Sequence, residues 1–149
     1  MDTTVAEIMR TKFVSFKKSD PLAKAINVFL TNPDMVFPVI ENCRAIGEIR
    51  QHDLLKLVIP LKYVDDGRVL GPAGIRDLLE HSAKTVGDIM KTSAIKVKAS
   101  VKVVDAARMM LETDALTLEV VDDCNNPVGF VSELDVLKYA KRKLEGRPK

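Results

Sequence analysis

An internal repeat constrains this chain more than any other feature of its sequence. The run TVAEIMRT, which begins at Thr4, returns at Thr85 as TVGDIMKT, with five identical residues in eight. A duplication of this kind dictates architecture, so we expect two similar copies rather than one continuous domain. The register continues to the end of both copies, with one residue inserted in the second, through the pairs Ser19/Ser100, Ala25/Ala106, Leu30/Leu111, Val39/Val120, Gly47/Gly129, Asp53/Asp135 and Leu55/Leu137.

Each copy predicts the same order of elements. Thr4 and Thr85 are each followed three residues later by an acidic residue, a pattern typical of a capped helix start. Alternating and helical apolar spacings then predict a strand, a helix that in the first copy has Pro21 at its first helical position, a strand pair and a closing helix. The predicted strands are 14–16, 36–40 and 45–49 in the first copy and 95–97, 116–121 and 128–131 in the second, and the closing helices are 53–58 and 133–144.

The fold class is therefore α+β (α/β), with two β-α-β-β-α units. Each unit leaves a face of its small sheet uncovered, so we expect the two copies to pack through their sheets with pseudo-two-fold symmetry. The copies occupy residues 3–59 and 84–141, and the turn residues between them predict a linker, 60–83, with one short helix around Ile75, Leu78 and Leu79. Residues 142–149 form a basic C-terminal tail.

Charge and hydropathy exclude several classes of protein. The 23 Lys and Arg residues nearly balance the 21 Asp and Glu residues, which argues against a strongly basic nucleic-acid binder. All of the positive excess lies in the last twelve residues, where six basic side chains stand against Glu145 alone. No stretch approaches the roughly 18 apolar residues of a membrane span, and no signal segment is visible, so the expected compartment is the cytoplasm.

The sequence shows no catalytic constellation. The two histidines, His52 and His81, have no partner at metal-ligand or catalytic spacing, and the usual nucleotide-hydrolase, dinucleotide and protease motifs are missing. Cys43 and Cys124 lie far apart without a C-x-x-C partner, which argues against a zinc site or a disulfide framework. We therefore expect a protein that is not an enzyme, with no metal and no required cofactor.

The end of the second copy carries the most informative motif. In GFVSELD, Ser132 ends a strand and Asp135 lies in the first turn of the next helix. A helix N-terminus favours an anion, a hydroxyl there can donate to a phosphate, and a carboxylate one turn later can accept from a ribose diol. Equally, Ser132 can cap the helix while Asp135 complements its dipole. The residues alone leave both interpretations open.

These motifs together resemble a tandem pair of cystathionine β-synthase (CBS) domains, often called a Bateman module, here without an attached enzyme or transporter domain. The resemblance rests on the repeated TV-x-[E/D]-IM opening, the VIE and VVD after a strand, and the G-h-h-[S/T]-x-x-D close, and it covers nearly the whole chain. It implies a homodimer that senses adenine nucleotides (AMP, ADP or ATP) or related adenosyl ligands, as regulatory ligands, in two clefts between the copies.

The resemblance also implies which residues form each cleft. One cleft, which we call the second, departs from the family motif. Asp53 matches the aspartate that is expected to bind the ribose, but Arg50 stands in place of the Ser/Thr and Glu48 in place of an apolar residue. Arg50 can grip a phosphate, or it can be neutralised by Glu48, two residues away on the same strand face. The first cleft, which we favour as the binding site, is expected to contain Lys12, Phe13, Val14, Met35, Val36, Phe37, Phe130, Ser132 and Asp135, and the second Arg50, Asp53, Ala94, Ile95 and Thr117.

Two other functions remain open. The basic segment 138–149 can attract nucleic acid or a partner protein, although cations in a last helical turn also complement the helix dipole. Alternatively, the chain is a dimer whose clefts are vestigial and bind nothing small. The client protein and the pathway are not encoded in any motif.

Overall fold

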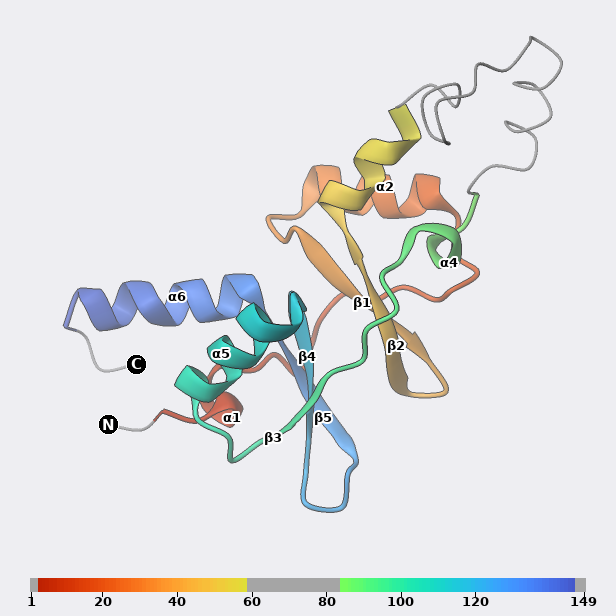
Figure 1. Ribbon diagram of the computed structural model, residues 1–149. Helices are drawn as coiled ribbons and strands as arrows, with labels where there is room; N and C mark the ends of the chain where they lie inside the picture. Colours follow the sequence, from red (N-terminus) through yellow and green to blue (C-terminus); the bar gives the residue numbers. More distant parts are fainter. Residues whose placement is uncertain (1–2, 59–83, 147–149) are drawn as a thin grey trace, which may run out of the picture.

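The chain folds into two small sheets, each flanked by helices, in a computed structural model that describes residues 3–58 and 84–146 (Figure 1). The predicted mixed α and β class is confirmed. The predicted linker, 60–83, with its short helix, and the end of the basic tail lie outside the described residues.

The second repeat follows its prediction closely. Strand β3 (Lys96–Lys98) lies parallel to β4 (Thr117–Val121), and β4 pairs antiparallel with β5 (Pro127–Ser132). Helix α5 (Val103–Thr113) joins β3 to β4, and α6 (Glu133–Leu144) follows β5 directly. The order β3-β4-β5 places the start of α6 beside the start of the central strand, where the amide of Glu133 donates to the carbonyl of Leu116.

The first repeat is a reduced version of the same unit. Strands β1 (Val36–Glu41) and β2 (Arg44–Arg50) form an antiparallel pair that follows helix α2 (Leu22–Thr31). The predicted strand 14–16 is reduced to one parallel bridge between Phe16 and Val39. The predicted closing helix is a 3-10 helix, η1 (Gln51–Val58), over the residues described.

Helix α2 starts one residue later than predicted. Pro21 adopts extended backbone angles at the N-cap instead of the first helical position, because it bridges the chain at Thr85 and the next amide donates to Lys84. The apolar spacing itself is confirmed, since Leu22, Ala25 and Phe29 are all buried.

The openings of the two repeats are exchanged. We call residues 3–10 and 84–91 the leading segments; they contain α1 (Val5–Ile8) and α4 (Val86–Ile89), and both predicted capping boxes are present. Val5 has no exposed surface and packs in the core of the second repeat, while Val86 packs in the core of the first. Each half is therefore completed by the start of the other, as Figure 1 shows for α1 and α4.

The sheets also meet directly, as predicted. Glu119 of β4 is 2% exposed and accepts hydrogen bonds from the amide of Ala45 at 2.7 Å and from Arg44 at 3.0 Å, both in β2. A buried carboxylate is stable only when it is paired and hydrogen-bonded, so these contacts fix how the sheets face each other. Within the described residues, no helix combines the length and the apolar character that crossing a membrane requires.

Candidate functional site

The first cleft lies between β1, the chain before Phe16 and the β5–α6 junction. It contains a cavity of about 20 Å³. Predicted and unpredicted residues share its wall, and the full set is Arg10, Phe13, Val14, Val36, Phe37, Pro38, Thr117, Phe130, Ser132 and Asp135.

Most of the residues predicted for this cleft are brought together. Phe13 and Phe130 pack edge to face with ring centroids 4.5 Å apart, and they provide an apolar wall. Two predicted residues are absent from the cavity wall: Lys12 is exposed, and the side chain of Met35 points to the surface with 64% exposure. Thr117, which we predicted for the second cleft, lines this one.

Ser132 and Asp135 form a complete helix cap at the start of α6. The amide of Ser132 donates to Asp135 Oδ2 at 2.8 Å, its hydroxyl donates to the same oxygen at 3.1 Å, and Asp135 N donates back to Ser132 Oγ at 3.4 Å. The capping interpretation of the motif is therefore correct. Both residues nevertheless line the cavity, so capping and ligand binding are compatible.

Arg10, which was not among the residues predicted from the sequence, joins two carboxylates at the first cleft. Its guanidinium donates to both oxygens of Asp34 at 2.7 and 2.8 Å, to Asp135 Oδ1 at 2.7 Å and to Ser132 Oγ at 3.2 Å. The bidentate bond to Asp34 is the main cause that raises the pKa of Arg10 above its ordinary value, so this side chain is always charged. The only signal in the sequence was the basic pair Arg10 and Lys91 at equivalent positions of the two leading segments.

Arg10 leaves little room in this cleft. Its guanidinium lies between Asp34, which precedes β1, and Asp135 in α6, and the remaining cavity holds about one water molecule. A larger ligand can enter only if the residues around Arg10 move.

Glu48 is a buried carboxylate of the second cleft. This side chain has no exposed surface, and its carboxylate accepts from the amides of Leu116 and Thr117 at 3.1 Å and from the Thr117 hydroxyl at 2.9 Å. Because these donors satisfy Glu48, it does not pair with Arg50. The direct ion pair that was one of the two expectations is not formed, although the charge of Glu48 contributes, as the last of several causes, to raising the pKa of Arg50.

Arg50 instead pairs with acids outside its strand. Its Nε lies 3.0 Å from Asp53, and its Nη1 lies 3.5 Å from Asp114, which Lys91 also contacts. The bond to Asp53 is the main cause that raises the pKa of Arg50. Of the other residues predicted here, Ala94 is exposed, and Ile95 packs against the core of the second repeat.

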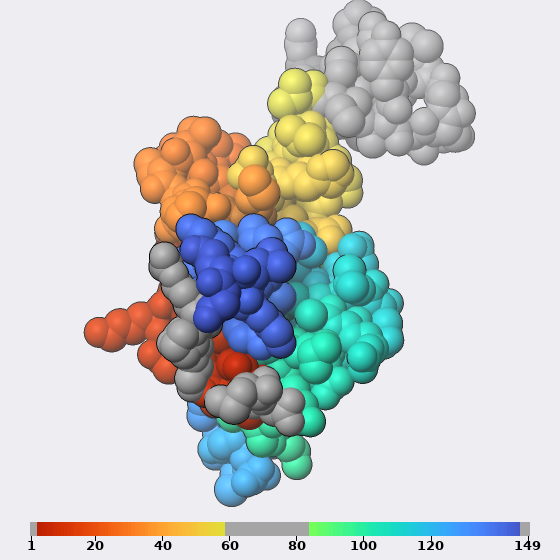
Figure 2. Space-filling model, turned by 90° about the vertical axis from the view of Figure 1, so that its left-hand side faces the viewer, coloured from red at the N-terminus to blue at the C-terminus, as the bar shows by residue number. Residues whose placement is uncertain are grey.

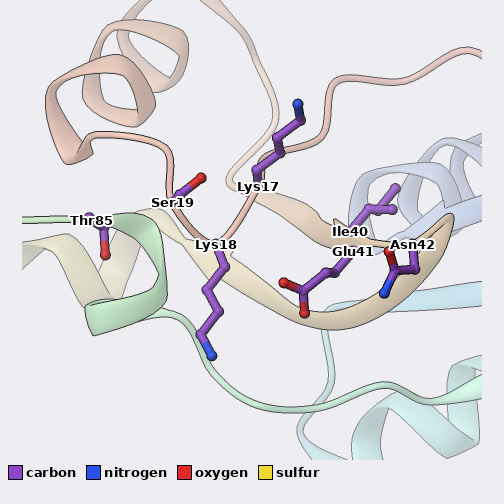
Figure 3. Close-up of a pocket in the computed structure, with 7 residues that line it drawn as sticks. All are labelled: Lys17, Lys18, Ser19, Ile40, Glu41, Asn42 and Thr85. Carbon is purple, nitrogen blue, oxygen red and sulfur yellow. The ribbon is translucent and has the colours of Figure 1, made fainter.

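Larger hollows lined by described residues lie outside the clefts. One, of about 430 Å³, is bordered by the loop before α2 and the β1–β2 turn (Figure 3). None of its seven lining residues is buried, and Lys17, Lys18 and Glu41 project from its rim, so it lacks a fixed polar group for a ligand. Another, of about 470 Å³, is an apolar groove between α5 and α6. Among the described residues, no cluster of three His, Cys, Asp or Glu side chains is arranged to hold a metal ion.

The family model of the CBS domain matches residues 5–60 and 86–142 of this sequence. The chain belongs to the CBS domain family. The two matches coincide with the two repeats, so each repeat is one CBS domain whose leading segment packs in the core of the other.

Similar proteins include pairs of known structure. The CBS-pair protein CBSX2 of Arabidopsis thaliana, solved in complex with AMP, is 26% identical, with a TM-score of 0.70 over 95% of this chain and 98% of that one. The CBS pair of protein MJ0100, solved with 5′-methylthioadenosine and S-adenosyl-L-methionine, has a TM-score of 0.66 over 96% and 99% of the two chains; at 19% identity it shows the shared fold. The uncharacterized protein MJ0188 of Methanocaldococcus jannaschii is 27% identical over 97% of this chain, which spans about half (49%) of that protein.

Proposed function

We propose that this CBS pair is a regulatory module that binds an adenine nucleotide, or a related adenosyl ligand, in the first cleft and catalyses no reaction. One observation carries the proposal: the Asp135 carboxylate at the start of α6 lines the same cavity as the packed rings of Phe13 and Phe130. An apolar wall beside one carboxylate suits a purine with its ribose diol. The AMP complex of the similar protein CBSX2 supports this ligand class.

The polar groups of the cleft favour binding over catalysis. The two hydroxyls that line the described cavity both donate to carboxylates, Ser132 to Asp135 while capping α6 and Thr117 to Glu48, instead of lying against a base. Arg10 stays charged and cannot act as a proton carrier. The Asp135 carboxylate is itself engaged by Arg10 and Ser132, so these groups suit holding a ligand better than attacking one.

We propose that the second cleft stays closed. Glu48 fills the position that Phe130 has in the first cleft, and its carboxylate uses the amides at the start of β4. Removing it from these donors leaves a buried charge or buried amides unsatisfied, which is costly.

Isothermal titration calorimetry with AMP, ADP, ATP and adenosine tests the proposed function. We expect one binding site per chain and a loss of affinity of about ten-fold or more in Asp135→Asn, which loses a charged acceptor. The matched control is Asp53→Asn, at the equivalent position of the second cleft, which should keep the wild-type affinity. Equal affinity of the wild type and Asp135→Asn would remove the site from the first cleft, and no binding of any of these ligands would reject the function.

We further propose that the chain forms a homodimer through its helices. Large exposed leucines recur at equivalent positions of both repeats, Leu30 with Leu111 at 77% and 86% exposure, and Leu55 with Leu137 at 59% and 64%. Figure 2 shows α6 and α5 projecting side by side on one face, and the apolar groove lies between them. Because the exposed leucines repeat at equivalent positions of the two copies, this apolar face can pack against the same face of a second chain.

The basic end of α6 does not favour the nucleic-acid alternative. Lys141, Arg142 and Lys143 lie in the last turn, where positive charges complement the helix dipole. Binding of DNA or RNA that disappears when the chain is truncated after Tyr139 would restore this alternative.

A further inference from the structure

The acceptors of Asp135 are nearly all used in the closed cleft. Its Oδ2 accepts both the amide and the hydroxyl of Ser132, and its Oδ1 accepts Arg10 Nε at 2.7 Å. A carboxylate offers about four lone-pair positions, so one remains. A ribose diol donates two hydrogen bonds, and it can therefore bind Asp135 fully only if Arg10 releases Oδ1.

Arg10 has a second ion pair, with Asp34, that can persist after Arg10 leaves Asp135. Its two terminal nitrogens form a bidentate pair with Asp34, whose side chain is 8% exposed. The guanidinium can thus turn away from Asp135 without becoming an unpaired charge. Breaking both contacts would leave two nearly buried carboxylates without a positively charged partner, which is strongly unfavourable.

The released guanidinium remains beside the position where a phosphate would bind. Arg10 Nη2 lies 3.2 Å from Ser132 Oγ, the hydroxyl at the N-terminus of α6. An anion that accepts from this hydroxyl therefore lies within reach of Arg10. When Arg10 leaves Asp135, it loses one charge-assisted hydrogen bond. A phosphate on the ligand can accept a new charge-assisted hydrogen bond from Arg10, whereas an uncharged nucleoside cannot.

We propose that Arg10 is a specificity-determining latch: it closes the empty cleft by bridging Asp34 and Asp135, and a 5′-phosphate on the ligand draws it from Asp135 while Asp34 retains it. The cleft consequently selects phosphorylated adenosyl ligands over adenosine. This inference rests on the proposed function, since it requires an adenosyl ligand with its ribose at Asp135.

The test compares AMP and adenosine by calorimetry in the wild type and in the double variant Arg10→Gln/Asp34→Asn, which removes one charge of each sign. We expect the preference for AMP over adenosine to fall about ten-fold or more, because AMP loses a charged donor while adenosine no longer has to displace one. The matched control is Lys91→Gln/Asp114→Asn, the basic residue at the equivalent position of the other leading segment with its acid, which should leave the preference unchanged.

A second measurement uses the unmodified protein, in case the double variant does not fold. In ¹⁵N-labelled wild type, saturation with AMP should shift the Arg10 Nε–H resonance, because this group leaves Asp135. An unchanged preference in the folded double variant, or AMP binding without a shift of this resonance, overturns the latch and leaves the proposed function standing. If the wild type binds neither AMP nor adenosine, the proposed function fails, and the latch fails with it.

Discussion

The backbones of Arg10 and Phe130 are joined by two hydrogen bonds, Arg10 N to Phe130 O at 2.8 Å and Phe130 N to Arg10 O at 2.9 Å. This bridge lays the first leading segment along the edge of β5 in the other repeat. It also holds the α-carbon of Arg10 beside the cleft, so that the guanidinium reaches Asp34 and Asp135. The exchange of leading segments is therefore what supplies the first cleft with its cation.

The close approach of the leading segment requires a glycine at position 129. A Cβ atom there would lie 2.7 Å from the carbonyl oxygen of Arg10, and at Gly47 it would overlap the carbonyl of Lys91. We expect Gly129→Ala to lower the free energy of unfolding by about 2 kcal/mol, because backbone atoms must shift to make room. Denaturant unfolding measures the loss, with Gly87→Ala for comparison: the Cβ there would lie 2.5 Å from the side-chain Cγ of Lys18 and 3.0 Å from its carbonyl oxygen, so a side chain takes up most of the shift. Equal stability of the two variants would contradict this account.

Glu48→Gln should destabilise the fold although it preserves the shape of the side chain. The amide group of glutamine presents hydrogens to one or more of the donors from Leu116 and Thr117 that the carboxylate satisfies. We expect a loss of about 2 kcal/mol in the free energy of unfolding, the cost of buried donors without an acceptor. Glu41→Gln, at the exposed end of β1, is the control and should have no measurable effect. A Glu48→Gln protein as stable as this control would show that the buried carboxylate is dispensable.

Asp114 should contribute to the pH dependence of stability. Lys91 and then Arg50 lower the pKa of this carboxyl, so the folded state favours its charged form. The stabilisation is present above the ordinary aspartate pKa of about 4 and is lost as the pH falls through the lowered folded value. Asp114→Asn, which also tolerates the left-handed backbone at this position (φ 57°), should therefore melt below the wild type at pH 7. The difference between their melting temperatures should shrink toward pH 3, and a constant difference would reject this role.

Replacing the exposed leucines of α5 and α6 by aspartate should separate the homodimer. Leu111→Asp or Leu137→Asp places a charge on the apolar face, where a second copy would have to desolvate it. Sedimentation analysis should show a dimer for the wild type and a monomer for either variant, with little change in thermal stability of the monomer because both leucines are exposed. Lys98→Asp, on the edge strand β3, is the control and should remain dimeric. A monomeric wild type would reject the proposed interface.

The order of elements, both capping boxes and the apolar spacing of α2 and α5 could be predicted from the sequence. These features depend on neighbours within a few residues, such as Thr4 with Glu7, and the repeat presented each of them twice. The predicted strand 14–16 failed in the first repeat because a strand needs a partner ladder, and only Phe16 finds one, at Val39.

Cleft residues with partners nearby in the sequence could be predicted, whereas those with distant partners could not. The motif around Ser132 and Asp135 is local, so the sequence indicated both its capping and its binding chemistry. The partners of Arg10 and Glu48 are distant: Asp135 lies 125 residues from Arg10, and Thr117 lies 69 residues from Glu48. Residues two apart on one strand, such as Glu48 and Arg50, suggested an ion pair, but buried amides of the other repeat compete better for the carboxylate.

By itself, then, the sequence determined a duplicated α+β unit and the polar groups at the end of each copy, because spacing and capping act over a few residues. Only the tertiary structure decided which copy each leading segment completes, and hence that Arg10 occupies the first cleft and that Glu48 is buried against the start of β4 in the second. The physical reason is that a buried charge takes its partners from whichever segments the packed cores bring beside it, and chain connectivity does not specify them.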